Sequence, residues 1–127
     1  MHTFTKAERL CSKKIIDDLF SGNQTRQVNH YPLMAIWKAI DLPDPTPVQV
    51  LITVPKKKFK KAHDRNRIRR QIKESYRLQK NTLYDALSMK RLQFAIVMVY
   101  IAKEKLNYTK IDHACCAIIK NITESAQ

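Results

Sequence analysis

The chain has 127 residues, of which 44% are hydrophobic, so we expect a single domain over residues 1–127 with a modest core. Its formal net charge of +13 predicts an anionic partner. No apolar run approaches the ~20 residues of a membrane span, and residues 1–14 lack the apolar core of a secretory signal. The three cysteines include one adjacent pair, which argues against a disulfide framework and favours a reducing, cytoplasmic setting.

The first predicted helix spans residues 12–21 and follows an extended lead-in over residues 1–9. Ser12 can accept a hydrogen bond from a free N–H of the first turn. Gly22, the only glycine, can adopt the left-handed conformation that ends a helix. Apolar residues at helical spacing predict a stripe that faces the core: Ile15, Ile16, Leu19 and Phe20.

Two strands are predicted after a polar loop at residues 23–29. The first spans residues 31–40, which hold Trp37 and several aliphatic side chains. Residues 41–47 hold three of the five prolines and form a connector. Residues 48–54 are apolar at nearly every position, which is typical of a strand buried on both faces.

A basic helix is predicted from His63 or Asp64 to near Gln79. Three apolar residues repeat every four positions along it and predict the stripe that packs on a sheet: Ile68, Ile72 and Tyr76. Residues 80–93 have helical propensity, and the pattern leaves open whether the basic helix continues or breaks at Asn81.

The last predicted elements are a central strand over residues 94–102 and a helix capped by Asn107 or Thr109. The helix has a predicted buried stripe of Ile111, Ala114, Cys115, Ile118 and Ile122. The order helix, strand, strand, helix, strand, helix predicts a single-domain α+β sandwich. Two parallel strands joined by a helix would ordinarily have a right-handed crossover.

The basic charge is concentrated in residues 54–77, which hold eleven Lys and Arg against two acidic residues and so carry +9 of the net +13. A solvated helix face usually mixes signs, whereas like charges four residues apart repel by a few tenths of a kcal/mol per pair. Such a row is formed here by Arg65, Arg69, Lys73 and Arg77. A solvated face remains the alternative, but the pattern favours a surface that binds nucleic acid.

The run AHDRNRIRRQIKESYR, preceded by LITV and PKKKFKK, resembles the signature of the bacterial ribonuclease P protein subunit. The Arg-Asn-Arg core of that signature corresponds to residues 65–67, and its upstream basic pair corresponds to Lys56 and Lys57. The resemblance is strong over residues 50–78 and collinear over residues 4–20. It is generic after Leu83.

The resemblance implies an α/β sandwich with an unusual left-handed crossover. It also implies one subunit of a ribonucleoprotein that hydrolytically removes the 5′ leader from precursor tRNA. In that family the catalytic RNA and its bound Mg²⁺ supply the chemistry, while the protein supports RNA folding, leader binding and metal affinity. The expected partners are therefore the catalytic RNA and precursor tRNA, with no membrane, no DNA and no requirement for a protein oligomer.

The resemblance also places the binding residues. The basic segment is expected to bind RNA through Lys56, Lys57, Lys60, Lys61, Arg65, Asn66, Arg67, Arg69, Arg70, Lys73 and Arg77. A cleft between the first helix and the sheet is expected to hold the leader through Phe20, Ile16 and Met34. For Phe20, a place in the core stays open beside this role, because the residue also belongs to the apolar stripe.

No catalytic constellation or protein metal site is predicted, because the sequence lacks HExxH, a CxxC pair, a Gly-rich phosphate loop and a nucleophile elbow. Asp17 and Asp18 would point about 100° apart on a helix, which makes a poor chelate. Asp64 is expected to cap the basic helix. His63 is interpreted as a helix-start residue, with an RNA contact or a general base as alternatives.

Two other functions compete with this prediction. A general RNA-binding or ribosomal-type module has the same basic surface but would not discriminate between precursor and mature tRNA. A DNA-reading helix-turn-helix is disfavoured, because no tight two-helix turn precedes the basic helix.

Overall fold

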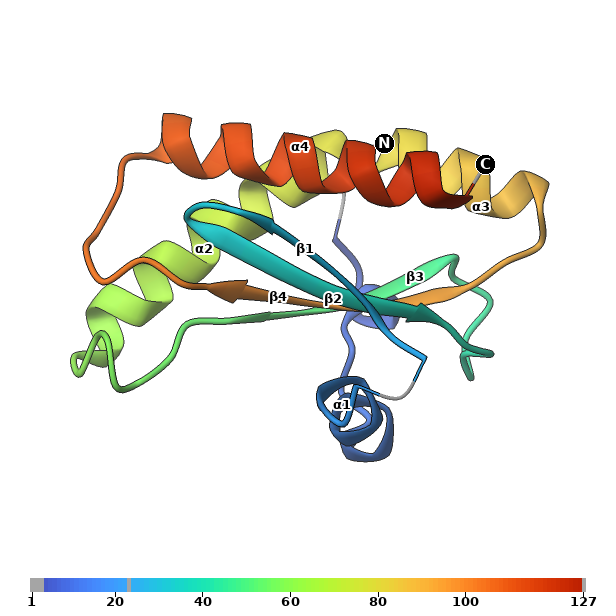
Figure 1. Cartoon of the computed structure of the whole chain (residues 1–127), viewed down its shortest axis with the longest axis horizontal. Coiled ribbons are helices and arrows are strands. Elements are labelled where there is room, and N and C mark those ends of the chain that lie inside the picture. Colours follow the sequence, from blue (N-terminus) through green and yellow to red (C-terminus); the bar gives the residue numbers. More distant parts are fainter. Residues whose placement is uncertain (1–3, 23, 127) are drawn as a thin grey trace.

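The computed structural model describes residues 4–22 and 24–126 and confirms the predicted α+β class. The elements are η1 (Lys6–Glu8), α1 (Lys13–Phe20), β1 (Arg26–His30), β2 (Leu33–Ala39), β3 (Val48–Thr53), α2 (Ala62–Gln79), α3 (Asn81–Met89), β4 (Phe94–Tyr100) and α4 (Tyr108–Ala126). The strands form one sheet in the order β1-β2-β4-β3. Figure 1 shows α2, α3 and α4 on one face of this sheet and α1 on the other.

β4 is an inner strand, as predicted, and pairs antiparallel with β2 and parallel with β3. The chain passes from β3 to β4 through α2 and α3. In Figure 1 both strands run from right to left, β3 lies behind β4, and the connecting helices lie above the sheet. The crossover is therefore left-handed, as the resemblance implies and against the general rule.

The sheet has one strand more than predicted. The sequence predicts a loop over residues 23–29, whereas β1 lies there as an edge strand that pairs with β2. Four of its five side chains are exposed, so its polar composition conceals its pairing. Tyr31 and Pro32 form the turn between β1 and β2, which is why the strand predicted at residues 31–40 is shorter than expected.

The predicted caps of the first and last helices are confirmed. Ser12 Oγ accepts a hydrogen bond from the Ile15 N–H at 3.4 Å, at the start of α1. Asn107 Oδ1 accepts one from the Lys110 N–H at 3.0 Å, at the start of α4. Gly22, just after α1, has the left-handed φ of 79° that its place at the helix end predicts.

The prediction for Asp64 is wrong, because α2 already begins at Ala62 and its N-cap residue is Lys61. Asp64 lies inside the first turn, where its carboxylate pairs with Lys105 Nζ at 2.9 Å. The helical segment does break after α2: Lys80 separates α2 from α3, which begins at the next residue.

The two sides of the sheet differ in how completely they are covered. The stripes predicted for α2 and α4 are buried, as are the β4 residues that they pack against. On the other face, α1 buries only Leu19. Ile15 and Ile16 are half-buried, and Phe20 is 53% exposed, so the expectation that the whole stripe faces the core is wrong.

The lead-in contains η1 instead of being extended throughout. Thr5 and Glu8 form a capping box, in which Glu8 Oε1 accepts hydrogen bonds from the Thr5 N–H at 2.9 Å and from its hydroxyl at 3.1 Å. Beyond this turn, the Leu10 N–H donates to the Val50 carbonyl at 3.0 Å. The lead-in is therefore attached to the outer edge of β3.

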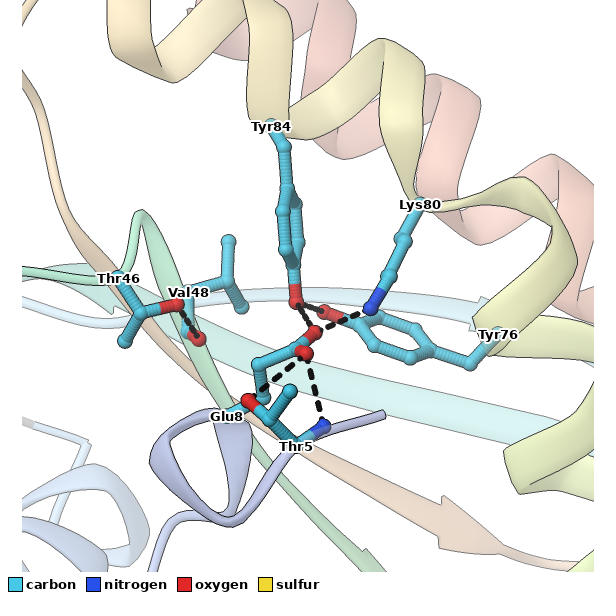
Figure 2. Close-up of polar contacts among 7 residues, drawn as sticks. All are labelled: Thr5, Glu8, Thr46, Val48, Tyr76, Lys80 and Tyr84. Carbon is cyan, nitrogen blue, oxygen red and sulfur yellow. Dashed lines mark hydrogen bonds and ion pairs between the residues drawn. The ribbon is translucent and has the colours of Figure 1, made fainter. Parts of the chain in front are cut away.

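A buried ion pair joins this lead-in to the junction of α2 and α3 (Figure 2). Lys80 Nζ and the Tyr84 hydroxyl both donate to Glu8 Oε2, and the Tyr76 hydroxyl lies 2.9 Å from that of Tyr84. Burial disfavours the charged form of Glu8, but hydrogen bonds from Lys80, Thr5 and Tyr84 outweigh it and hold the pKa of Glu8 below its ordinary value. Burial raises the pKa of both tyrosines, so their hydroxyls stay protonated and able to donate.

We predict that Glu8→Gln lowers the free energy of unfolding at pH 7 by about 3 kcal/mol, because it leaves the Lys80 ammonium buried without its counter-charge. The contribution of the carboxylate is fully present above its unfolded pKa of ~4.3 and is lost as pH falls through its lower folded pKa. Urea unfolding at pH 7 and at successive acid pH values would show the difference between wild type and variant shrinking below pH ~4.

The matched control is Glu124→Gln, which makes the same change at an exposed position of α4. It should alter the unfolding free energy by less than about 0.5 kcal/mol. A difference between wild type and Glu8→Gln that stays constant from neutral to acid pH would contradict a role for the Glu8 charge.

Candidate nucleic-acid interface

The basic face lies on the outside of α2 because the opposite side of this helix is buried. Ile68, Ile72 and Tyr76 are at most 1% exposed and belong to the main core. The predicted RNA-binding residues of the helix lie away from this stripe and are exposed or half-buried. The four predicted lysines of the β3–α2 connection are also exposed: Lys56, Lys57, Lys60 and Lys61. The structure thus brings the four lysines to the start of α2, from which the basic residues of the helix extend to Arg77 in its last turn.

Arg65 holds the basic connection in place. Its guanidinium donates from Nη1 to the carbonyls of Phe59 and Lys60, both at 2.8 Å. Phe59 is buried and its ring lies 5.8 Å from that of Tyr100, so the connection is anchored to the core on one side and to α2 on the other. Arg65 therefore orders the lysines beside it, and part of its hydrogen-bonding capacity is already used within the protein.

Other predicted residues are also engaged with their neighbours on α2. Arg69 donates to Asn66 Oδ1 at 2.9 Å, which orients both side chains. Arg77 pairs with Glu74 through Nη2 at 2.6 Å and Nε at 3.1 Å. The hydrogen bond from Arg77 lowers the pKa of Glu74, so this carboxylate stays ionised and neutralises Arg77.

Arg67 and Arg70 are the predicted arginines most available to a partner. Both are exposed, and neither has a hydrogen-bond or ion-pair partner among residues 4–22 and 24–126. Lys73 is half-buried and lies over the Phe4 ring, with Nζ 5.1 Å from the ring centroid. The sequence could not show which of these basic side chains are available to a partner, because that depends on the contacts that each makes in the folded protein.

Lys105 neutralises Asp64, the acidic residue in the first turn of α2, through a contact that the sequence did not indicate. Its ammonium hydrogen-bonds to Asp64, lowering the pKa of that carboxyl and keeping it ionised. His63, beside it, is exposed, with Nδ1 3.8 Å from Asp64 Oδ1, which fits the helix-start interpretation. Within the described ranges, no group of three or more His, Cys, Asp or Glu side chains could hold a metal ion.

The predicted leader-cleft residues lie on the face of the sheet that α1 covers. Ile16 is half-buried in a small cluster between α1 and the sheet that also contains Ile36. Met34 points to the same face, two residues before Ile36 on β2, and is half-buried. Phe20, at the end of α1, is exposed, so the alternative that places it in the core is wrong. Its contact with a leader stays a prediction.

The attachment of α1 explains why part of this face stays accessible. Lys38, near the end of β2, forms an ion pair with Asp18 of α1. Gln27 of β1 donates to Asn29 Oδ1 at 3.1 Å and lies 3.2 Å from Met34 Sδ, further along the same face. The two residues paired with Met34 across the sheet are not buried either: Asn29 of β1 is exposed and Val99 of β4 is half-buried. Among the helices that the structure describes, none is both long and apolar enough to cross a membrane.

Comparison with known proteins identifies the family of this chain. A family model described as Ribonuclease P matches residues 4–123. The ribonuclease P protein component of Porphyromonas gingivalis is 28% identical over 110 residues, which cover 87% of this chain and 79% of the relative. That of Chlorobaculum tepidum is 57% identical over 42 residues, covering 33% of this chain and 27% of the relative.

Solved structures of ribonuclease P proteins have the same fold. The protein from Thermotoga maritima has a TM-score of 0.70 at 18% identity, covering 91% of this chain and 97% of that one. The protein from Staphylococcus aureus has a TM-score of 0.66 at 18% identity, with coverage of 96% and 97%. The family match over nearly all of the sequence is the decisive finding: the chain belongs to the ribonuclease P protein family.

Proposed function

We propose that this protein is the RNA-binding subunit of a ribonuclease P ribonucleoprotein that removes the 5′ leader from precursor tRNA. The observation that carries the proposal is the basic face of α2 and its connection, where Arg67 and Arg70 are exposed beside four exposed lysines. Such a surface neutralises phosphates and releases their counterions. Family membership selects the catalytic RNA as the first partner of this face.

The leader is proposed to lie on the sheet face beside α1. Phe20 offers an exposed ring for stacking on a base, and Ile16 and Met34 offer half-buried apolar surface nearby. The leader would then be held next to the structured RNA that α2 binds. This arrangement favours precursor over mature tRNA, whereas a general RNA-binding module would treat the two alike.

The cleavage chemistry is assigned to the RNA subunit and to Mg²⁺ that is bound mainly by RNA. The protein contributes positive charge, which offsets repulsion between the two RNAs and so strengthens metal binding near the cleavage site. Its own side chains hold the RNA in place and take no part in bond breaking.

The test is cleavage of a precursor tRNA at low Mg²⁺ by the protein alone, by a bacterial ribonuclease P RNA alone and by the two together. We expect cleavage at the mature 5′ end only in the combined mixture. The Arg67→Ala/Arg70→Ala double variant should lose most of this stimulation, and Lys120→Ala, which removes an exposed charge from α4, should keep it. Arg65 is left intact because it holds the connection.

Two results would overturn parts of this proposal. Cleavage by the protein alone would contradict the assignment of the chemistry to RNA. A protein that binds RNA but does not stimulate the catalytic RNA, and that binds precursor and mature tRNA equally, would instead be a general RNA-binding module.

A second prediction concerns Arg67 as a phosphate contact. We expect Arg67→Ala to weaken binding of the catalytic RNA by ~1–2 kcal/mol and to reduce the slope of log K against log salt by about one unit. Binding titrations at several salt concentrations measure both quantities, with Lys120→Ala as the control of equal charge. An unchanged slope would remove Arg67 from the phosphate contacts.

A third prediction separates the leader site from the basic face. Phe20→Ala should weaken binding of a precursor tRNA with a single-stranded leader by ~1–3 kcal/mol and leave binding of mature tRNA unchanged. Because Phe20 is 53% exposed, its replacement should leave the fold intact. Met89→Ala, at an exposed apolar residue of α3, is the control. Equal losses for precursor and mature tRNA would contradict a leader contact.

A further inference from the structure

A pocket of about 350 Å³ lies at the outer edge of β3, between the lead-in and α2. Its apolar lining includes Leu10 and residues Val50 to Ile52 of β3, and Phe4 lines it as well. Its volume falls within the range of small-ligand sites. Two of its lining residues, Arg69 and Lys73, belong to the predicted RNA-binding set, whereas the pocket itself has no predicted role.

The rim of the pocket is positively charged. Arg9 of the lead-in and Arg69 and Lys73 of α2 line it, and no acidic residue is among the lining residues. Arg9 is exposed, and Arg69 uses one guanidinium nitrogen to reach Asn66. The chemistry of the rim therefore fits an anion, while that of the interior fits an apolar or aromatic group.

The edge of β3 adds a hydrogen-bonding surface to the pocket. The backbone carbonyl of Val50 points to the outer edge of the sheet, because it accepts a hydrogen bond from the Leu10 N–H of the lead-in at 3.0 Å. Backbone direction alternates along a strand, so the N–H and carbonyl of Ile52 face the same outer edge. In the described part of the chain, neither of these groups has a hydrogen-bond partner outside the sheet. Ile52 therefore presents a donor and an acceptor side by side at the pocket.

We propose that this pocket binds one unstacked nucleotide of a single-stranded RNA segment. The base enters the apolar interior and pairs with the N–H and carbonyl of Ile52, and its phosphate lies between Arg9 and Arg69. A nucleotide combines the properties that the site requires: an aromatic plane, adjacent donors and acceptors, and a negative charge. The proposal rests on the proposed function. It extends the proposed RNA-binding surface from α2 to the lead-in.

A peptide strand added to β3 fits this edge less well. The lead-in already occupies the outer edge at Val50, and Pro55 follows the end of the strand, so the open stretch is too short for a ladder. The three cations likewise favour a phosphate over a neutral peptide. An acidic peptide is the rival that the experiment must distinguish.

Two exposed cysteines allow a direct test. Cys11 lines the pocket, and Cys116 is exposed on α4, away from it. Cys115 is buried, and burial raises the pKa of its thiol to about 12, so it does not react. The rate of alkylation by N-ethylmaleimide is measured for each thiol by mass spectrometry. A saturating uridine decamer should slow the reaction of Cys11 at least threefold and leave that of Cys116 unchanged.

The contribution of the base is tested with a decamer of abasic ribose phosphates, also at saturation. It should protect Cys11 less than half as well as the uridine decamer. Arg9→Gln should abolish most of the protection, whereas Lys6→Gln, an equal charge change on η1 outside the pocket, should preserve it. Protection should also persist in Phe20→Ala, which removes the proposed leader contact instead.

The outcomes separate this proposal from the proposed function. If the decamer binds but Cys11 reacts as fast as before, or if protection depends on Phe20 and not on Arg9, the pocket does not bind a nucleotide and the proposed function stands. If decaglutamate protects Cys11 better than RNA does, the site binds acidic peptides and the proposal is overturned. If neither the decamer nor the catalytic RNA binds the protein, both proposals fail together.

Discussion

The buried ion pair between Glu8 and Lys80 is the constraint that ties the lead-in to the helices on one face of the sheet. It joins the lead-in to the point where α2 ends and α3 begins, although the two residues are far apart in the sequence. A charge that is 5–8% exposed is stable only beside its partner, so each residue fixes the position of the other. Tyr84 and Tyr76 extend the network into the core and leave no polar atom there unsatisfied.

Contacts within the protein also divide the arginines and lysines of the basic segment into two groups. Arg65 orders the connection, and Arg77 is neutralised by Glu74, so these two arginines act largely within the protein. Arg67, Arg70 and the exposed lysines remain available for the proposed contacts with RNA. The repulsion among them is tolerated because the buried stripe of α2 supplies the packing energy that holds the helix in place.

The sequence predicted most of the fold, because continuous apolar runs mark β3 and β4 and apolar residues at helical spacing mark α2 and α4. It missed β1, whose polar side chains carry no alternation, since an edge strand exposed to solvent needs none. It also missed the pairing of Glu8 with Lys80, because periodicity does not report which buried charges meet. For the candidate site, residue type identified the basic face, but the distinction between Arg65 and Arg67 depends on backbone carbonyls that only the folded connection presents.

The parallel pairing of β3 with β4 has a consequence for how the protein folds. The sheet cannot close at this position until the intervening chain, including α2 and α3, has been laid across its face. Pairings between strands so distant in sequence carry a large entropic penalty of loop closure and are formed slowly. Because the basic face lies on this same crossover, the predicted RNA-binding surface is assembled in the step that completes the sheet. A chain with an incomplete sheet would therefore have basic residues but no ordered surface to present to RNA.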